Sequence, residues 1–156
     1  MPRLLSALCI LCLSLPLMAE PPVTAEKPWV REAPPGTSVT AAYLMLHNRG
    51  EEAVALTAVS ADEFARAELH ETVHDEGEAR MRRIDTLTIP PGEKVALEPG
   101  GKHLMLHDAR GELRDGDWVT LTLRFDNEQL LQIAAPVRKR TGRASDENSG
   151  HDGGHQ

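Results

Sequence analysis

One short stretch in the second half of the chain carries the side chains best suited to metal chemistry. Successive side chains of an extended strand point to opposite faces, so Leu104 and Leu106 would share one face. His103, Met105 and His107 would share the other. Methionine usually fills a core, but here that would require both leucines to face solvent. The pattern therefore predicts a thioether beside two imidazoles on an outer face, a combination that suits soft metal ions.

A second stretch offers further donors. If Leu69 faces the core, His70 lies on the outer face of its strand together with Glu68. A carboxylate next to a histidine is commonplace on strands, and a single surface histidine carries no weight alone. Met81 lies between two arginines, and its orientation is ambiguous because Ile84 breaks the alternation.

The elements that must position these residues are short strands. Turn signals rich in Pro, Gly, Asn and Asp recur along the chain, and between them lie segments with period-two hydrophobicity. No stretch has the pattern of a long amphipathic helix. We expect an all-β, cupredoxin-like antiparallel β-sandwich or Greek-key barrel. Its strands would number about nine, near residues 29–32, 42–46, 53–60, 66–73, 79–85, 94–98, 103–107, 119–125 and 131–137.

The first residues have the pattern of an export signal. A basic start, an apolar run and a small residue at Ala19 predict a secretory signal peptide over residues 1–19. Its apolar run of about 14 residues would rise about 21 Å as a helix, which is shorter than a hydrocarbon core of about 30 Å, so we expect no stable membrane insertion. Leucine precedes both Cys9 and Cys12, where a lipoprotein signal needs a small residue. Cleavage would remove both cysteines.

The rest of the chain divides into a short leader over residues 20–27, a β domain over residues 28–137 and a tail over residues 138–156. The tail begins with basic residues and continues as a polar, acidic, Gly- and His-bearing segment. Because it has no apolar residue beyond Ala144, it cannot bury a core, and we expect it to be disordered.

Four of the candidate residues share a fixed spacing. Ten residues separate His70 from Met81, 21 separate Met81 from His103, and one separates His103 from Met105. The sequence resembles the PCuAC family of extracytoplasmic copper(I) chaperones, whose pattern is His-x10-Met-x21-His-x-Met, and all four positions match without a gap. The resemblance covers about residues 28–136 and includes Trp29-Val-Arg31, Ala42-Tyr43, Glu68-Leu-His-Glu71, Met81-Arg82 and Pro99-Gly-Gly-x-His-Leu-Met-Leu106.

The resemblance implies a cupredoxin-like barrel with a surface Cu(I) site whose ligands are His70, Met81, His103 and Met105. It implies a periplasmic chaperone that delivers one Cu(I) to the dinuclear copper centre of cytochrome c oxidase, with a Sco-type protein as a further partner. Two imidazoles and two thioethers form a shell that suits soft Cu(I). Thioethers, unlike thiols, cannot be lost to disulfide formation in an oxidising compartment.

Other classes of function fit the sequence less well. Aromatic residues are only 3% of the chain and the net charge is −7, which argues against nucleic-acid binding. The sequence has no Gly-x-Ser-x-Gly and no His-Glu-x-x-His motif, and the mature chain would have no Cys nucleophile or blue-copper Cys ligand, so we expect no enzyme. Two alternatives remain open: a periplasmic copper buffer or tolerance protein, and a metal-free β-sandwich interaction module.

The remaining histidines fall outside the family spacing. His47, His74 and His107 are interpreted as surface histidines, although His74 and His107 lie close enough in sequence to the pattern to approach the metal. In the tail, His151 and His155 flank a carboxylate and two glycines. Imidazole with oxygen or backbone nitrogen suits the harder Cu(II) ion, so these two histidines are candidate secondary metal ligands that would support the buffer alternative.

Overall fold

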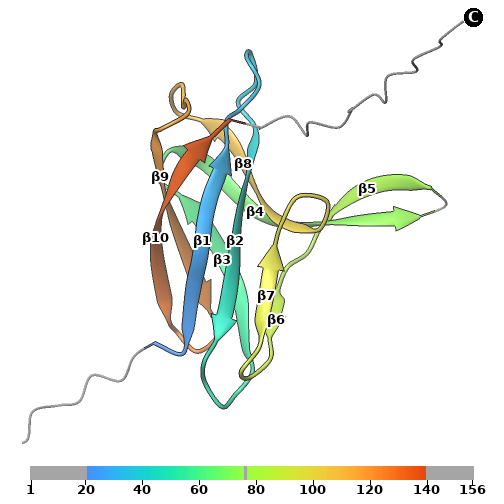
Figure 1. Ribbon diagram of the computed structural model, residues 1–156, viewed down its shortest axis with the longest axis vertical. Coiled ribbons are helices and arrows are strands. Elements are labelled where there is room, and N and C mark those ends of the chain that lie inside the picture. Colours follow the sequence, from blue (N-terminus) through green and yellow to red (C-terminus); the bar gives the residue numbers. More distant parts are fainter. Residues whose placement is uncertain (1–20, 76, 140–156) are drawn as a thin grey trace, which may run out of the picture.

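The computed structural model describes residues 21–75 and 77–139. Over these residues the chain forms ten strands and no helix (Figure 1). The strands are β1 (Val23–Arg31), β2 (Thr40–Asn48), β3 (Val54–Ala61), β4 (Phe64–Asp75), β5 (Glu78–Arg83), β6 (Leu87–Ile89), β7 (Lys94–Leu97), β8 (Lys102–Ala109), β9 (Trp118–Phe125) and β10 (Leu130–Arg138). The described part contains no long apolar helix of the kind that crosses a membrane.

The strands form a cupredoxin-like β-sandwich, as expected. Their order is β5-β4-β8-β2-β1-β10-β9-β3-β6, with β7 paired to the remaining part of β2. The sheet is mixed rather than purely antiparallel, because β1 runs parallel to β10 where the two halves of the sandwich join. The count of about nine strands misses β6, since three residues are too few to show an alternating pattern.

The core is formed by the inward faces of both halves. Leu104 and Leu106 of β8 are fully buried, which confirms the orientation expected from the alternation. Across the sandwich, Val119, Leu121 and Leu123 of β9 are equally buried. With the leucines of β8 held inward, the pleat directs the residues between them to the outer face.

The first strand begins earlier than expected. β1 starts at Val23, inside the segment 20–27 that the sequence predicts as a leader, and Val23 is 0% exposed. The strand pairs with β2, but its register shifts between Glu26 and Trp29, and Lys27 has a φ of 51°. This bulge interrupts the alternation, and it is the physical reason why the pattern hid the start of the strand.

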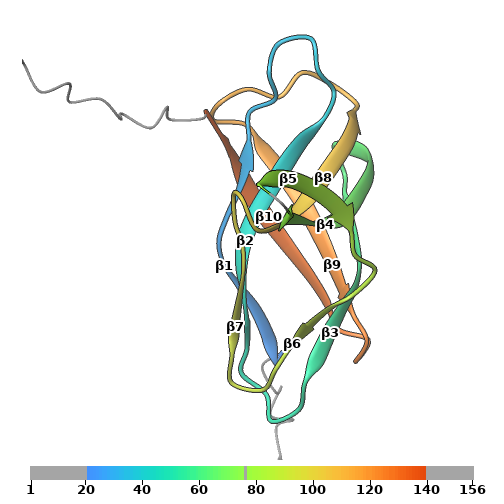
Figure 2. The same ribbon diagram turned by 90° about the vertical axis from the view of Figure 1, so that its right-hand side faces the viewer.

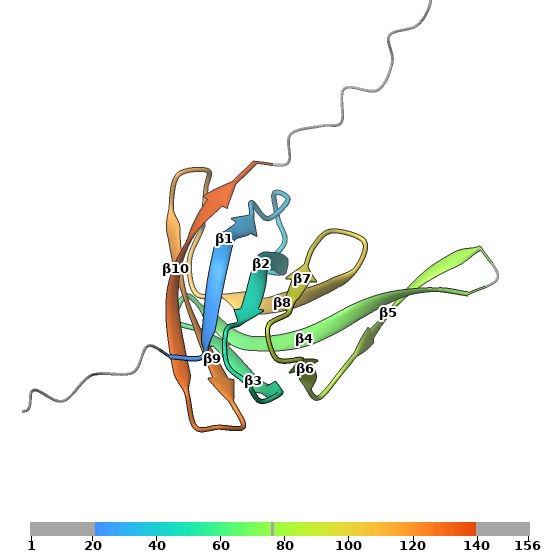
Figure 3. The same ribbon diagram turned by 60° about the horizontal axis from the view of Figure 1, so that its bottom comes forward.

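The β4–β5 hairpin projects from the body of the sandwich (Figures 1 and 3). β4 pairs with β8 through Glu71 and with β5 from His70 onward. His70 therefore lies where the sheet ends and the projecting hairpin begins. The predicted signal peptide (1–19) and the tail histidines His151 and His155 lie outside the described residues.

Candidate metal centre

Two neighbouring strands bring the outward-facing donors together. β4 and β8 are antiparallel, and their register places His70 opposite His103 and Glu68 opposite Met105. The next outward position of β8 is His107, opposite Arg66. Figure 2 looks toward this side of the molecule, with β4 and β8 next to each other behind β5.

Three imidazoles meet on this outer face. The ring centroids of His70 and His103 are 6.0 Å apart, and those of His70 and His107 are 6.4 Å apart. His103 is the most buried of the three, at 5% exposed, and its Nδ1 lies 3.0 Å from the carbonyl oxygen of Gly101. Because a carbonyl oxygen only accepts, Nδ1 must carry the proton, which leaves the lone pair of Nε2 available to a metal ion.

Glu68 connects two of the histidines. Its Oε2 lies 3.2 Å from Nε2 of His70 and 3.4 Å from Nε2 of His107. The hydrogen bond with His70 is the main reason why the pKa of Glu68 is lowered, with smaller contributions from Arg66, Arg83 and His107 against an opposing effect of burial. Glu68, His70 and His107 are hereafter the Glu68 cluster, and their donor atoms all lie within 4.8 Å of one another.

The two methionines of the predicted ligand set are placed differently. Met105 is half-buried on the outer face between His103 and His107. Met81 lies on β5 opposite Thr72, and it is 65% exposed. The β4 partners of the two methionines are four positions apart, about 13 Å along an extended strand. The structure thus gathers His70, His103 and Met105, while Met81 lies at the base of the hairpin.

An aromatic pair borders the site. Tyr43 of β2 is buried, and its ring centroid lies 6.5 Å from that of His103. Trp29 stacks on Tyr43 with centroids 4.6 Å apart, and the guanidinium of Arg31 lies 5.4 Å from the Tyr43 ring. Burial raises the pKa of Tyr43, so the phenol is neutral at physiological pH and forms an uncharged wall beside His103.

Comparisons with known proteins agree with this fold and give the family. The model of the LpqE-like family, described as lipoproteins, matches residues 23–137. The chain belongs to the LpqE-like family. A relative named as a lipoprotein in Leifsonia xyli is 31% identical over 135 residues, which covers 82% of this chain and 80% of the relative.

Solved structures of PCuAC domains resemble this LpqE-like chain. The copper-bound PCuAC domain from PmoF2 is 25% identical, with a TM-score of 0.64, and the match covers 78% of this chain and 96% of that domain. The Cu(I) form of DR1885 from Deinococcus radiodurans is 30% identical, with a TM-score of 0.64 over 80% of this chain and 83% of that protein. The resemblance to the PCuAC family is confirmed.

The structure shows where the three histidines outside the family spacing lie relative to the candidate site. His107 lies in the Glu68 cluster, beside Glu68 and His70, and its interpretation as a surface histidine stays a prediction. His74 is exposed on the hairpin opposite Ala79, and His47 lies on β2 near Glu26. Sequence reasoning placed Glu68 on the outer face with His70 but gave it no role, because a carboxylate next to a histidine is commonplace on strands. The sequence pattern that pointed to both residues was the alternation: Glu68 shares a strand face with His70, and His107 shares one with His103 and Met105.

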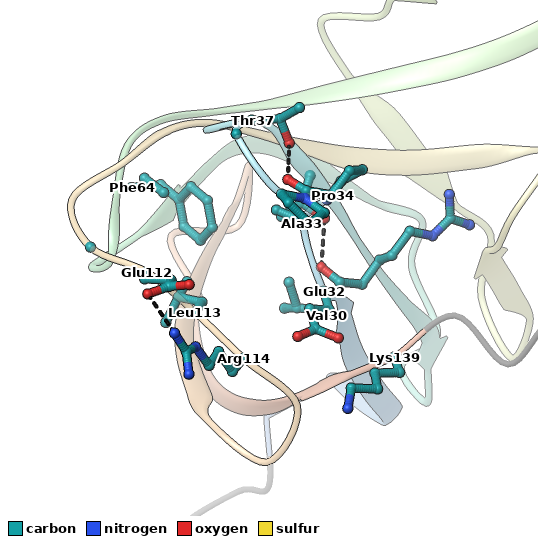
Figure 4. Close-up of a pocket in the computed structure, with 16 residues that line it drawn as sticks. Val30, Glu32, Ala33, Pro34, Thr37, Phe64, Glu112, Leu113, Arg114 and Lys139 are labelled. Carbon is teal, nitrogen blue, oxygen red and sulfur yellow. Dashed lines mark hydrogen bonds and ion pairs between the residues drawn. The ribbon is translucent and has the colours of Figure 1, made fainter.

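A cavity elsewhere in the LpqE-like domain has a different character. It has a volume of about 520 Å³ at one end of the sandwich, and neither histidine nor methionine lines it. Figure 4 shows Phe64 and Leu113 on one side of the cavity, Glu32 and Lys139 on the other, and Arg114 paired with Glu112. The charged side chains that line this cavity do not gather around one atom, whereas two histidines and two arginines contact the carboxylate of Glu68.

Proposed function

We propose that this chain is an exported, periplasmic copper chaperone rather than an enzyme. It binds one Cu(I) through His70, Met81, His103 and Met105. The observation that carries the proposal is the pairing of His70 with His103 across β4 and β8, with Met105 beside them on the outer face. The similarity to a copper-bound PCuAC domain and to the Cu(I) form of DR1885 supports copper as the cargo.

The arrangement suits reversible binding of a soft ion. Nε2 of His103 already presents a lone pair, because its Nδ1 is engaged with Gly101. Thioethers need no deprotonation, so Met105 and Met81 donate at any pH. A partly buried half-site of His70, His103 and Met105 would hold the ion, and the exposed Met81 would complete the shell from the hairpin. Since Met81 is reachable from solvent, an acceptor protein can displace it first.

Delivery is proposed to an extracytoplasmic acceptor, the dinuclear copper centre of cytochrome c oxidase, with a Sco-type protein as a further partner. Deletion of the gene should lower oxidase activity at low copper and leave copper tolerance unchanged. Copper sensitivity with normal oxidase activity would instead establish the buffer alternative.

The ligand set is tested by an anaerobic Cu(I) titration against a chromophoric chelator. The double variant Met81→Leu/Met105→Leu should lose at least about tenfold in affinity, because leucine keeps the shape and removes the sulfur donor. Met45→Leu is the matched control, since Met45 is a half-buried methionine on the neighbouring β2. Unchanged Cu(I) affinity in the double variant would contradict the assignment.

A further inference from the structure

The Glu68 cluster has a chemistry different from that of the proposed Cu(I) set. Two imidazoles and one carboxylate are harder donors than thioethers, and such sets suit Cu(II) and Zn(II). Only His70 is common to both sets. We propose that Glu68, His70 and His107 bind a divalent transition-metal ion, Cu(II) or Zn(II), in a second mode that excludes Cu(I).

The distances within the cluster fit a coordination shell. Ligand atoms about 2.05 Å from a tetrahedral ion lie about 3.3 Å from one another. The two separations from Oε2 of Glu68 are 3.2 Å to His70 and 3.4 Å to His107. All three donor atoms lie within 4.8 Å of one another, so modest side-chain rotation closes the remaining gap.

The cluster also has unused donor capacity. His107 Nε2 is buried and makes no hydrogen bond of good geometry, and Nδ1 of His70 is likewise buried without a partner. The side chains of Glu68, His70 and His107 are only 17–18% exposed. A buried polar atom without a partner costs free energy, and a metal ion between these side chains would satisfy Nε2 of His107.

Neighbouring arginines orient the carboxylate. Arg83 Nη1 lies 3.3 Å and Arg66 Nε lies 3.9 Å from Oε1 of Glu68, which leaves Oε2 toward the histidines. Outer contacts of this kind fix metal ligands in place. Both arginines are more than half exposed, so water and salt screen their repulsion of a cation.

The experiment uses Zn(II), which has no redox chemistry, and then Cu(II). All proteins carry His151→Gln and His155→Gln, so that tail imidazoles do not contribute. We expect one equivalent of Zn(II) and a metal-dependent rise in melting temperature. His107→Asn and Glu68→Gln should each weaken Zn(II) binding at least about tenfold. His47→Asn, a matched histidine beside a carboxylate on the same face, should change nothing. The same substitutions should weaken Cu(II) binding, and each protein should bind Cu(II) more tightly than Zn(II).

The results would overturn the proposal if Zn(II) does not bind, or binds His107→Asn and Glu68→Gln as tightly as the parent. Shared use of His70 rests on the proposed Cu(I) set, and it predicts that preloaded Cu(I) blocks Zn(II). Simultaneous binding of one Cu(I) and one Zn(II) would contradict the shared use of His70.

Failure of the proposed function has a different signature. In that case Cu(I) affinity would not depend on Met81 and Met105, while Zn(II) affinity would still depend on Glu68 and His107. If both proposals hold, Met105→Leu should lower the affinity for Cu(I) and leave that for Zn(II) unchanged. His107→Asn should lower the affinity for Zn(II) and leave that for Cu(I) unchanged.

Discussion

The outer face of the sandwich carries two groups in which a carboxylate meets histidine, and they differ in what holds the carboxylate. In the Glu68 cluster, one oxygen faces two imidazoles and the other contacts arginines. In the second group, hereafter the Glu26 cluster (Glu26, His47 and Lys94), Nζ of Lys94 lies 2.8 and 2.9 Å from the two oxygens of Glu26. His47 Nδ1 lies 3.6 Å from Glu26 Oε1.

The difference shows what turns a polar group into a metal site. The ammonium of Lys94 neutralises Glu26 and contacts both of its oxygens, and among the described residues the imidazole that pairs with Glu26 is that of His47. At Glu68 the arginines contact one carboxylate oxygen, so the other oxygen is left beside two imidazole nitrogens. A cation held by Glu68 therefore gains ligands, whereas at Glu26 it would compete with lysine for a single carboxylate.

Truncating a core leucine under either cluster should have the strongest effect on stability. Leu104 lies between His103 and Met105, and Leu46 lies between Met45 and His47; both leucines are fully buried. Leu104→Ala and Leu46→Ala should each lower the free energy of unfolding by about 2 to 5 kcal/mol, measured by urea unfolding with tryptophan fluorescence. Only Leu104→Ala should also weaken Cu(I) binding by the folded protein. Equal weakening by both substitutions would show that the core under β8 has no special role in Cu(I) binding.

The next effect tests the histidines directly. His70→Asn removes a donor common to both proposed ligand sets, so Cu(I) and Zn(II) affinities should each fall about 100-fold or more, which is more than the loss of an outer contact costs. His47→Asn should leave both affinities unchanged. Competition titrations with chromophoric chelators measure the two ions separately. A comparable loss in His47→Asn would show that the Glu26 cluster also binds metal.

A substitution in the Glu26 cluster should create a metal site there. His47 and Lys94 are directly opposite each other on β2 and β7. Lys94→His removes the cation and adds the second imidazole that the Glu26 cluster lacks. We expect one additional, weaker equivalent of Zn(II), seen by calorimetry in a His107→Asn background. If Lys94→His binds no additional Zn(II), the number of imidazole donors is not the reason why the Glu68 cluster would bind metal and the Glu26 cluster would not.

The smallest effect concerns acid stability. The hydrogen bond from Lys94 is the main cause that lowers the pKa of Glu26 below its ordinary value of about 4.5. A lowered folded-state pKa stabilises the protein above the unfolded value, and this contribution is lost as pH falls through the folded value. Lys94→Met should therefore reduce the urea midpoint slightly at pH 6 and by less as the pH falls below the ordinary range of a glutamate carboxyl. An equal reduction across this pH range would assign the loss to packing instead of charge.

The alternation of residues along β8 could be predicted without the structure. Leu104 and Leu106 had to face inward, because turning two leucines to the outer face of the sheet costs more than turning His103 and Met105 to that face. The class of fold followed from the same periodicity, since many short alternating segments without helical patterns can bury their apolar faces only in a sandwich or barrel. The spacing of the motif, together with its flanks, then pointed to the family.

Local pattern did not determine how the strands meet. The bulge between Glu26 and Trp29 concealed the start of β1, and three residues were too few to reveal β6. Alternation also left Met81 ambiguous, since every residue of β5 is exposed on the projecting hairpin and neither face is selected by burial.

Which polar residues become neighbours depends on how distant strands pair. His74 and His107 were equally eligible by sequence, yet only His107 reaches Glu68. The register of β4 against β8 puts His107 opposite Arg66, next to Glu68, and carries His74 out along the hairpin. That register is set by long-range burial of Leu69 against Leu104 and Ala67 against Leu106. A slip by one residue would turn the apolar set to solvent, so the core fixes the contacts of a surface site.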